Sequence, residues 1–456
     1  VVIKQFNTMT TFERKIYTRM LDWKARYSDR YALLIEGARR VGKTTIVEEF
    51  AKREFESYIL IDFTTASDET KQWFKDYADD LDTLFRQIQF RYSTRLKNGR
   101  SVIIFDEVQS FPQARQLIKH LVKDGRYSYI ETGSLISLKQ NVEGILIPSE
   151  EMHIQMHPLD FEEFLWAQGD TATVDLLRES FRSLKPLGDS THKQLMGKYI
   201  TYMLVGGMPQ AVEAFIDSNN FDDVETVKRT IIDLYRDDTA KIKFDKGSKA
   251  RRILDRIPAL LSRHDKRFSP SQLKKGSKTR DYFDSVVWLG ESKIVNICHD
   301  VSDPGPAMGL SIDEHSFKLY MIDTGLLISS SFLSNIDTYE ELYDMMLRGR
   351  LNMNKGMLLE NMVAQELVAK DNELLFCRFH VKETDNPQEV DFLLVKNGMV
   401  LPIEVKSGAD STSHISLDRF LIKFKDVADR AYVVHTKDLR IDGNITYLPV
   451  YMTMLL

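Results

Sequence analysis

A run of eight residues near the start of the chain has the types and spacing that bind phosphate. It fits the pattern G-x-x-x-x-G-K-[ST] of a phosphate-binding loop and consists of Gly37, Ala38, Arg39, Arg40, Val41, Gly42, Lys43 and Thr44. The two glycines allow the backbone angles that close a loop whose N–H groups point at the phosphates. Lys43 is expected to reach the β- and γ-phosphates, and Thr44 to place its hydroxyl on Mg²⁺. The run therefore predicts that the protein binds a nucleotide together with Mg²⁺.

The segments around this run provide the context that the motif requires. Residues 31–35 are apolar and read as a strand, and residues 44–53, which include Thr45, read as a helix. The positive end of that helix adds to the attraction for phosphate. Strand, loop and helix together indicate a P-loop rather than a chance match.

Hydrolysis needs further groups, and two carboxylates follow a short apolar run at residues 101–105. Asp106 is expected to belong to the shell of Mg²⁺, and Glu107 to orient or deprotonate the attacking water. The alternative is a buried strand that ends at a solvated acidic turn. Thr132 and Ser134 end another apolar run, where their hydroxyls either sense the γ-phosphate or belong to an ordinary glycine turn.

Apolar segments alternate with helical segments through the first third of the chain, which is typical of a parallel sheet. Strands are predicted at 31–36, 58–63, 101–106, 128–133 and 152–157. Asp62, near the end of the second strand, either borders the nucleotide pocket or caps its own loop. The sequence therefore predicts an α/β fold in residues 1–165, with a parallel P-loop sheet preceded by an amphipathic helix.

Composition and cysteine content narrow the class of protein. The 456 residues are 43% hydrophobic and 28% charged, which is ordinary for a soluble protein of several domains. No apolar run approaches the roughly 18 residues that span a bilayer, and no signal peptide is evident. Cys298 and Cys377 are the two cysteines and fall in separate predicted domains, so neither a disulfide framework nor a zinc motif is expected. We therefore expect a cytoplasmic protein with no membrane partner.

Positive charge is concentrated in one segment, although the whole chain has a net charge of −5. Residues 241–280 hold 14 Lys or Arg and three Asp, which is typical of a surface that binds a polyanion. The alternative is a solvated basic face. A winged helix is predicted in residues 245–335, with a first helix at 251–263, a short second helix that begins at 269–271, and a third helix, the presumed recognition helix, led by 278–280. Strands at 293–298 and 317–322 would form the wing, so we expect contact with duplex DNA. Residues 166–244 read as a helical lid or connector.

Residues 345–456 carry a second group of charged side chains. Glu360 lies on an amphipathic helix, Asp391 lies in a strand, and Glu404 and Lys406 lie two apart in the next strand and so share a face. Such carboxylates suit a hard divalent ion, with Asp391 and Glu404 as ligands and Lys406 placed to position water or stabilise a phosphorane. This is the order of the PD-(D/E)XK nuclease fold. The alternative is a half-buried strand with one charged face.

Together these motifs resemble a widespread prokaryotic family of AAA-type ATPases that join a P-loop domain to a restriction-endonuclease-like domain. The match covers almost the whole chain and is carried by Gly37–Thr45, Val102–Gln109, Thr132–Ser134, His157–Phe164, Gly206–Pro209, Lys318–Gly325, Glu389–Phe392 and Ile403–Lys406.

The resemblance implies two sites. ATP and Mg²⁺ are expected at Lys43, Thr44, Asp106 and Glu107, and a nuclease-like cluster is expected at Glu360, Asp391, Glu404 and Lys406. One feature departs from the family: many relatives have Gly-Arg shortly before the segment that begins at His157, whereas Ile145 follows Gly144 here. No arginine finger is therefore identified, and Arg126, just ahead of the strand that bears Thr132, is the candidate.

Two hypotheses of different classes follow. The first is an enzyme, a Mg²⁺-dependent ATPase whose nucleotide state controls a DNA-associated, nuclease-like module. The second is a nucleotide-gated, DNA-binding switch with slow turnover and an inactive nuclease-like domain. Glu107 favours the enzyme, and the missing finger favours the switch. The sequence leaves the nuclease activity, the DNA target and the formation of homo-oligomers open.

Overall fold

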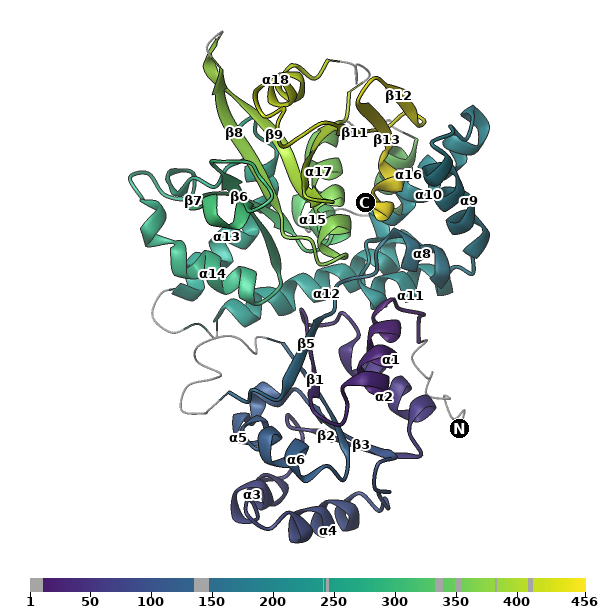
Figure 1. The fold of residues 1–456 in the computed structure, drawn as a ribbon, viewed down its shortest axis with the longest axis vertical. Helices are drawn as coiled ribbons and strands as arrows, with labels where there is room; N and C mark the ends of the chain where they lie inside the picture. Colours follow the sequence, from purple (N-terminus) through teal and green to yellow (C-terminus); the bar gives the residue numbers. More distant parts are fainter. Residues whose placement is uncertain are drawn as a thin grey trace. The chain divides into compact units, whose positions relative to one another are not determined.

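The computed structural model describes residues 11–134, 147–240, 242, 246–332, 339–348, 354–381, 384–408 and 413–456. The chain divides into two units, of which the first comprises Val1–His157 with Glu291–Lys293, and the second Pro158–Gly290 with Ile294–Leu456 (Figure 1). The finer division at 1–165, 166–244, 245–335 and 345–456 stays a prediction. None of the helices in the described part of the chain has both the length and the apolar character needed to cross a bilayer.

The first unit is built around five parallel strands in the order β2-β3-β4-β1-β5. They are β1 (Ala32–Glu36), β2 (Ser57–Asp62), β3 (Ser101–Asp106), β4 (Ser128–Gly133) and β5 (Glu151–Gln155). Each lies within two residues of its predicted bounds, and the parallel α/β sheet is confirmed. β4 separates β1 from β3, so the strand ends that carry the P-loop, the acidic pair and Thr132 are neighbours.

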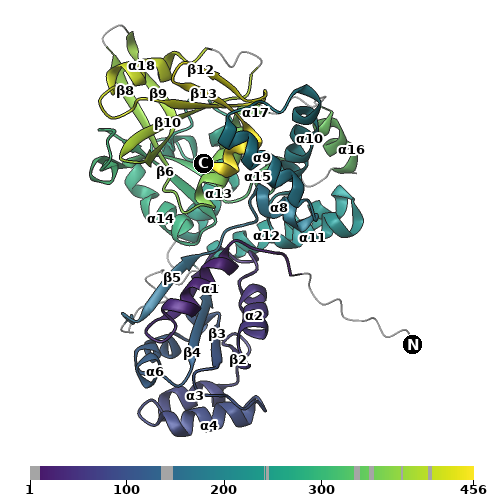
Figure 2. The same ribbon diagram turned by 45° about the vertical axis from the view of Figure 1, so that its right-hand side comes forward.

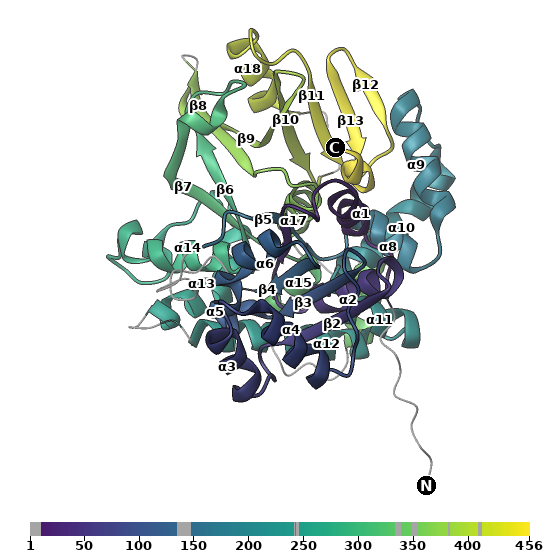
Figure 3. The same cartoon turned by 60° about the horizontal axis from the view of Figure 1, so that its bottom comes forward.

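Helices enclose this sheet (Figure 3). α3 to α6 pack on one face, where aromatic rings such as Phe63, Phe74 and Phe105 meet edge to face. α2 contacts β2, β3 and β4, and α1 packs against α2. The bounds are α1 (Ile16–Arg26), α2 (Lys43–Glu54), α3 (Asp68–Asp76), α4 (Leu81–Arg91), η1 (Val108–Ser110), α5 (Pro112–Gln116) and α6 (Ile118–Asp124).

The second unit holds a mixed sheet of eight strands in the order β12-β13-β11-β10-β9-β8-β6-β7. Their bounds are β6 (Val295–Val301), β7 (Ile312–Met321), β8 (Leu375–Val381), β9 (Thr384–Lys396), β10 (Met399–Lys406), β11 (Ala431–His435), β12 (Arg440–Asp442) and β13 (Ile445–Pro449). Helix α17 (Lys355–Val368) contacts β10 and β7, and α18 (Ile415–Lys423) packs on β9 through a shared apolar core (Figure 2).

The C-terminal part of this unit has a simple chain order. After α17, strand β9 pairs antiparallel with both β8 and β10. Helix α18 follows, and β11 then pairs parallel with β10. The pairing of Ile403 with Phe392 places Glu404 beside Asp391. Helix α17 thus leads into these three strands, and α18 forms the crossover that joins β10 to its parallel neighbour β11.

The remaining helices of the second unit precede, interrupt or follow the strands of the sheet. Their bounds are α8 (Phe161–Ala167), α9 (Thr171–Ser183), α10 (Asp189–Val205), α11 (Pro209–Ser218), α12 (Phe221–Ala240), α13 (Lys246–Leu261), η2 (Pro270–Gln272), η3 (Thr279–Asp281), α14 (Phe283–Glu291), η4 (Met308–Ser311), α15 (Thr324–Ser331), α16 (Tyr339–Leu347) and η5 (Val450–Leu455). Asp160 and Glu163 form a capping box that starts α8.

The region predicted as a winged helix differs from that prediction in two respects. The short second helix, predicted to begin at residues 269–271, is only the 3-10 turn η2, which has no side-chain cap. β6 and β7 pair antiparallel as wing strands do, but β6 also pairs with β8 and so extends the large sheet. The winged-helix assignment therefore stays a prediction.

Candidate functional site

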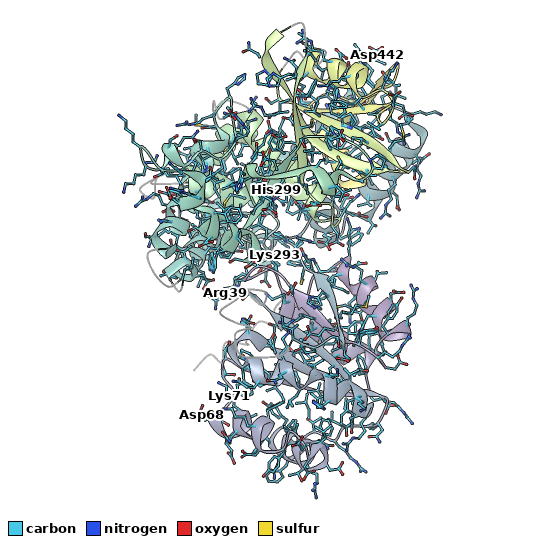
Figure 4. All side chains as sticks on the ribbon, turned by 60° about the vertical axis from the view of Figure 1, so that its left-hand side comes forward. Arg39, Asp68, Lys71, Lys293, His299 and Asp442 are labelled. Atoms are coloured by element: carbon cyan, nitrogen blue, oxygen red, sulfur yellow. The ribbon has the colours of Figure 1, made fainter. Side chains whose placement is uncertain are left out.

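The loop between β1 and α2 has the shape that its glycines predict, for two different reasons. Gly42 has φ 96° and precedes the first residue of α2, a conformation that glycine adopts without strain. Gly37 is needed for close approach instead, because a Cβ there would lie 2.4 Å from the backbone oxygen of Met156. Arg39, labelled in Figure 4, lies on the loop between them. The P-loop backbone therefore depends on both glycines.

Lys43 is the first residue of α2, and its side chain is buried. Its Nζ donates to the backbone oxygens of Gly37 (3.0 Å) and Ala38 (2.9 Å), so the ammonium group lies inside the loop. Burial lowers the pKa of Lys43 to about 8, although Glu107 and Asp106 act in the opposite direction. A lysine held here is placed for the phosphates that the loop would enclose.

Asp106 joins the P-loop to the neighbouring strands. The hydroxyl of Thr44 donates to both of its carboxylate oxygens, at 2.9 and 3.0 Å, and the hydroxyl of Thr132 donates to Oδ1. Burial raises the pKa of Asp106, and the two hydroxyl hydrogen bonds oppose that rise. Carboxylate and hydroxyl oxygens are ligands that Mg²⁺ prefers, so Thr44 and Asp106 fit the ion that accompanies ATP.

Glu107 follows at the same edge of the sheet. Its backbone is left-handed (φ 52°), and its N–H donates to the hydroxyl of Thr132 at 3.3 Å. Gln109 donates from Nε2 to Glu107 Oε2 at 2.5 Å, and the same nitrogen lies 3.5 Å from Ser134 Oγ. The predicted catalytic carboxylate is therefore held by a side chain that the sequence analysis did not single out.

Two other sequence-predicted residues have local roles. Asp62 accepts hydrogen bonds from the N–H and hydroxyl of Thr64, at 2.8 and 2.6 Å, and from the hydroxyl of Thr65. It caps its loop, which was one of the two alternatives. Arg126 precedes β4 and so lies at the strand end opposite Thr132, where it pairs with Asp124 and Asp82. It therefore cannot reach the P-loop of its own chain.

The predicted C-terminal residues do come together in the second unit. Val405 N–H donates to Asp391 Oδ2 at 2.8 Å, and Lys406 Nζ lies 2.9 Å from Glu404 Oε1. Burial raises the pKa of Glu404 to about 8, and the charges of Asp391 and Glu360 raise it further. We call Glu360, Asp391 and Glu404 the carboxylate cluster.

Two lysines that were not predicted lie against this cluster. Lys318, on β7, is fully buried, and its Nζ lies 2.7 Å from Glu389 Oε1 and 3.8 Å from Asp391 Oδ1. Burial alone would lower the pKa of Lys318, but the carboxylates of Glu389, Asp391 and Glu360 together raise it. Lys266 donates to Glu360, whose second oxygen accepts from the hydroxyl of Tyr320 at 3.2 Å.

In this structure lysine side chains, rather than an ion, lie against the carboxylate cluster. Across the residues that the structure describes, no group of three or more His, Cys, Asp or Glu side chains is placed to hold a metal. The ammonium groups of Lys266, Lys318 and Lys406 instead contact the carboxylates that an ion would need. The metal role predicted for Asp391 and Glu404 therefore stays a prediction, and no catalytic step is assigned to it.

Comparison with known families decides the class of the first unit. Residues 29–165 match the model of an AAA domain. They form an AAA-type P-loop ATPase domain. Residues 196–337 and 355–452 match two domains of unknown function, DUF8612 and DUF4143. No curated protein matches the chain.

Solved structures show only distant likeness. PCH-2 of C. elegans is 13% identical, with 46% of this chain and 64% of that chain covered and a TM-score of 0.28. A signal transduction ATPase with a tetratricopeptide repeat sensor from Pyrococcus horikoshii is 10% identical, with 80% of this chain and 50% of that chain covered and a TM-score of 0.29. Drosophila ORC bound to DNA is 10% identical, with 72% of this chain and 88% of that chain covered and a TM-score of 0.27.

This chain thus spans less than two thirds of the first two of these proteins. At TM-scores this low the three likenesses carry no argument about function. The assignment of the AAA domain therefore depends on its family match, its P-loop and its parallel sheet.

The basic segment is largely exposed in the second unit. Its exposed cations lie on α13 and in the stretch before α14, and include Arg251, Arg252, Arg256, Arg263, Lys274, Lys275, Lys278 and Arg280. Residues 241 and 243–245 of the segment lie outside the described ranges. Helix α14, the presumed recognition helix, contains no Lys or Arg. The positive charge therefore precedes that helix rather than lying on it.

Several contributing residues escaped the sequence analysis. Arg14 donates to the backbone oxygens of Val41 (3.1 Å) and His157 (2.6 Å) and so supports the P-loop from the lead-in segment. No local pattern marks such an arginine. Lys318 had a weak signal, because a lysine within an apolar strand run must find a buried partner.

Raising the pH above 8 is expected to weaken ATP binding to the AAA domain. Burial lowers the pKa of Lys43 to about 8 in the free protein, whereas the phosphates of ATP favour its charged form. Binding then takes up a proton, so the association constant is expected to fall up to about tenfold per pH unit above 8. Calorimetry in two buffers of different ionisation enthalpy measures affinity and proton uptake together.

The control for this prediction is Lys43→Arg, whose guanidinium stays charged throughout the range. Its affinity for ATP is expected to be independent of pH, whatever its absolute value. A wild-type association constant that stays level from about pH 7 to 9 would show that Lys43 is already charged before ATP arrives.

Proposed function

We propose that this protein is a Mg²⁺-dependent ATPase in which Glu107 activates the attacking water. The observation that carries the proposal is the convergence of Thr44, Asp106, Thr132 and Glu107 at one edge of a parallel sheet, next to the P-loop. Thr44 and Asp106 would hold Mg²⁺, which when bound neutralises charge on the phosphates. Lys43 offsets the charge that develops on the γ-phosphate, and Thr132 keeps Asp106 oriented.

We further propose that the nucleotide state of the AAA domain controls a DNA-associated, nuclease-like module. The chain order α17, β8 to β10, α18, β11 supports a restriction-endonuclease-like core. The placement of Asp391, Glu404 and Lys406 on adjacent strands supports it as well. The exposed cations on α13 and before α14 form a positively charged surface that would attract the phosphates of duplex DNA.

A second candidate function is supported by the lysines of the carboxylate cluster. In a nucleotide-gated, DNA-binding switch the nuclease-like module would bind without cleaving. Lys266 and Lys318 neutralise Glu360 and Asp391 from within the fold, so the cluster is balanced without a metal. This candidate keeps the nucleotide site and the DNA partner, but it turns ATP over slowly and leaves the DNA uncleaved.

The deciding experiment is ATP turnover with and without duplex DNA, at about 50 and 200 mM salt. We expect Mg²⁺-dependent turnover that Lys43→Ala abolishes, and a DNA effect that is lost at the higher salt, because phosphate contacts release counterions. Turnover without any response to DNA would contradict the proposed coupling. A DNA affinity that is independent of salt would contradict the basic surface.

A charge-matched pair of variants locates that surface. Replacing Lys274, Lys275 and Lys278 with Ala is expected to remove the DNA effect and leave basal turnover unchanged. Replacing the exposed lysines 193, 425 and 437 with Ala removes the same charge elsewhere in the second unit and is expected to leave the DNA effect intact. Plasmid from the same incubations separates the two candidates: intact DNA favours the switch, and cleavage that Lys406→Ala abolishes favours the nuclease.

A further inference from the structure

We infer that Gln109 holds the attacking water together with Glu107. This inference rests on the proposed role of Glu107 in hydrolysis and adds a second residue that contacts the reacting water. Gln109 lies on η1, the turn that directly follows the acidic end of β3. Its side chain reaches back to Glu107 and toward Ser134, so it lies at the same strand ends as the P-loop partners.

The orientation of the Gln109 amide follows from its partner. An ionised carboxylate can only accept hydrogen bonds, so the group that faces Glu107 Oε2 at 2.5 Å must be the nitrogen, Nε2. The carbonyl oxygen, Oε1, is therefore directed away from that contact. Oε1 is buried, and no hydrogen-bond donor of the described residues reaches it.

A buried acceptor without a donor is uncommon in folded proteins, and an ordered water is one group that satisfies it. Glu107 uses Oε2 for Gln109 and keeps Oε1 as an acceptor. Carboxylate and amide oxygens side by side can each accept one hydrogen of the same water. The water's lone pair is then free for the γ-phosphorus, which is the task that a glutamine performs in some other P-loop enzymes.

The step balances on these groups. The water oxygen forms a bond to the γ-phosphorus, and the bond from that phosphorus to the β–γ bridging oxygen breaks, with its electron pair leaving on ADP. One water proton passes to the Glu107 carboxylate. The other stays on the transferred phosphate and is held during the attack by Gln109 Oε1. Gln109 therefore changes no charge and acts by orientation alone.

The test compares kcat and nucleotide affinity in Gln109→Met and Gln89→Met. Methionine has a similar length and no hydrogen-bonding amide. Gln109→Met is expected to lower kcat about 10²-fold with the Kd for ATP unchanged. Gln89 is the matched control, because its amide bonds Leu96 N–H (2.8 Å) and Phe85 O (3.2 Å) within the same domain. Its variant is expected to lower Tm and keep kcat.

Glu107→Gln and the double variant complete the design. If the two side chains hold one water, Glu107→Gln/Gln109→Met is expected to turn over no more slowly than Glu107→Gln alone. Wild-type kcat in Gln109→Met, or a loss of kcat matched by an equal loss of ATP affinity, overturns the inference. Wild-type kcat in Glu107→Gln instead overturns the proposed function, so the two failures are distinguishable.

Discussion

A Glu107→Gln variant is expected to bind ATP like the wild type and to lose about 10²–10⁴-fold in kcat. Glutamine keeps the size of the side chain and an oxygen that accepts from Gln109, so the local geometry is retained. It removes the basic carboxylate that takes the water proton. Asp106, which pairs with Thr44, is unchanged, so Mg²⁺ and ATP are expected to bind.

The rate of phosphate release measures kcat, and titration with a fluorescent nucleotide measures the binding affinity. The matched control is Glu49→Gln, which makes the same chemical change at a carboxylate that pairs with Arg53 on the surface of α2. Its kcat is expected to equal that of the wild type. Equal turnover in Glu107→Gln and in the control would mean that another group activates the water.

A Lys318→Met variant is expected to lower the free energy of unfolding by about 3–5 kcal/mol, because removing one partner of a buried ion pair leaves a buried charge uncompensated. Lys318 is fully buried, and Glu389 and Asp391 lie 2.7 and 3.8 Å from its Nζ. Methionine fills a similar volume, so packing over the ring of Phe376 is largely kept. Denaturant unfolding monitored by fluorescence measures the change.

The control for Lys318 is Lys423→Met. Lys423 also lies over aromatic rings, those of Phe379 and Phe424, but its side chain is exposed. Its replacement is expected to lower the free energy of unfolding by less than about 1 kcal/mol, as for other exposed charges. Similar losses in the two variants would show that Lys318 is not needed to balance the carboxylate cluster.

The geometry of the candidate nucleotide site could be predicted because its parts are local. The P-loop is one contiguous run, and its conformation depends on glycines at set positions, of which Gly42 has the left-handed backbone. Strand β3 is an apolar run that stops at Asp106, so the sequence also marks the sheet edge. Parallel strands end together, which is why Asp106 and Thr132 could be placed near Thr44 before any coordinates were known.

The second helix of the predicted winged helix shows where such local reasoning fails. Ser269 and Pro270 are typical of a helix start, yet the structure has only the turn η2 there. A helix of one turn has too few hydrogen bonds to persist without tertiary contacts, so the local signal does not determine its length. The basic charge, predicted to cover the first two helices and the start of the third, precedes α14 and does not lie on it.

By itself, the sequence determined the AAA domain, its strands and its P-loop, because each consists of a contiguous run of residue types. It also determined which C-terminal strands carry Asp391, Glu404 and Lys406. Only the tertiary structure decided how those carboxylates are balanced and how Glu107 is held. Lys266 and Lys318 reach the cluster from segments far away in the chain. Buried carboxylates must be neutralised by cations that the fold brings near them. The spacing of residues along the sequence does not show which cations these are.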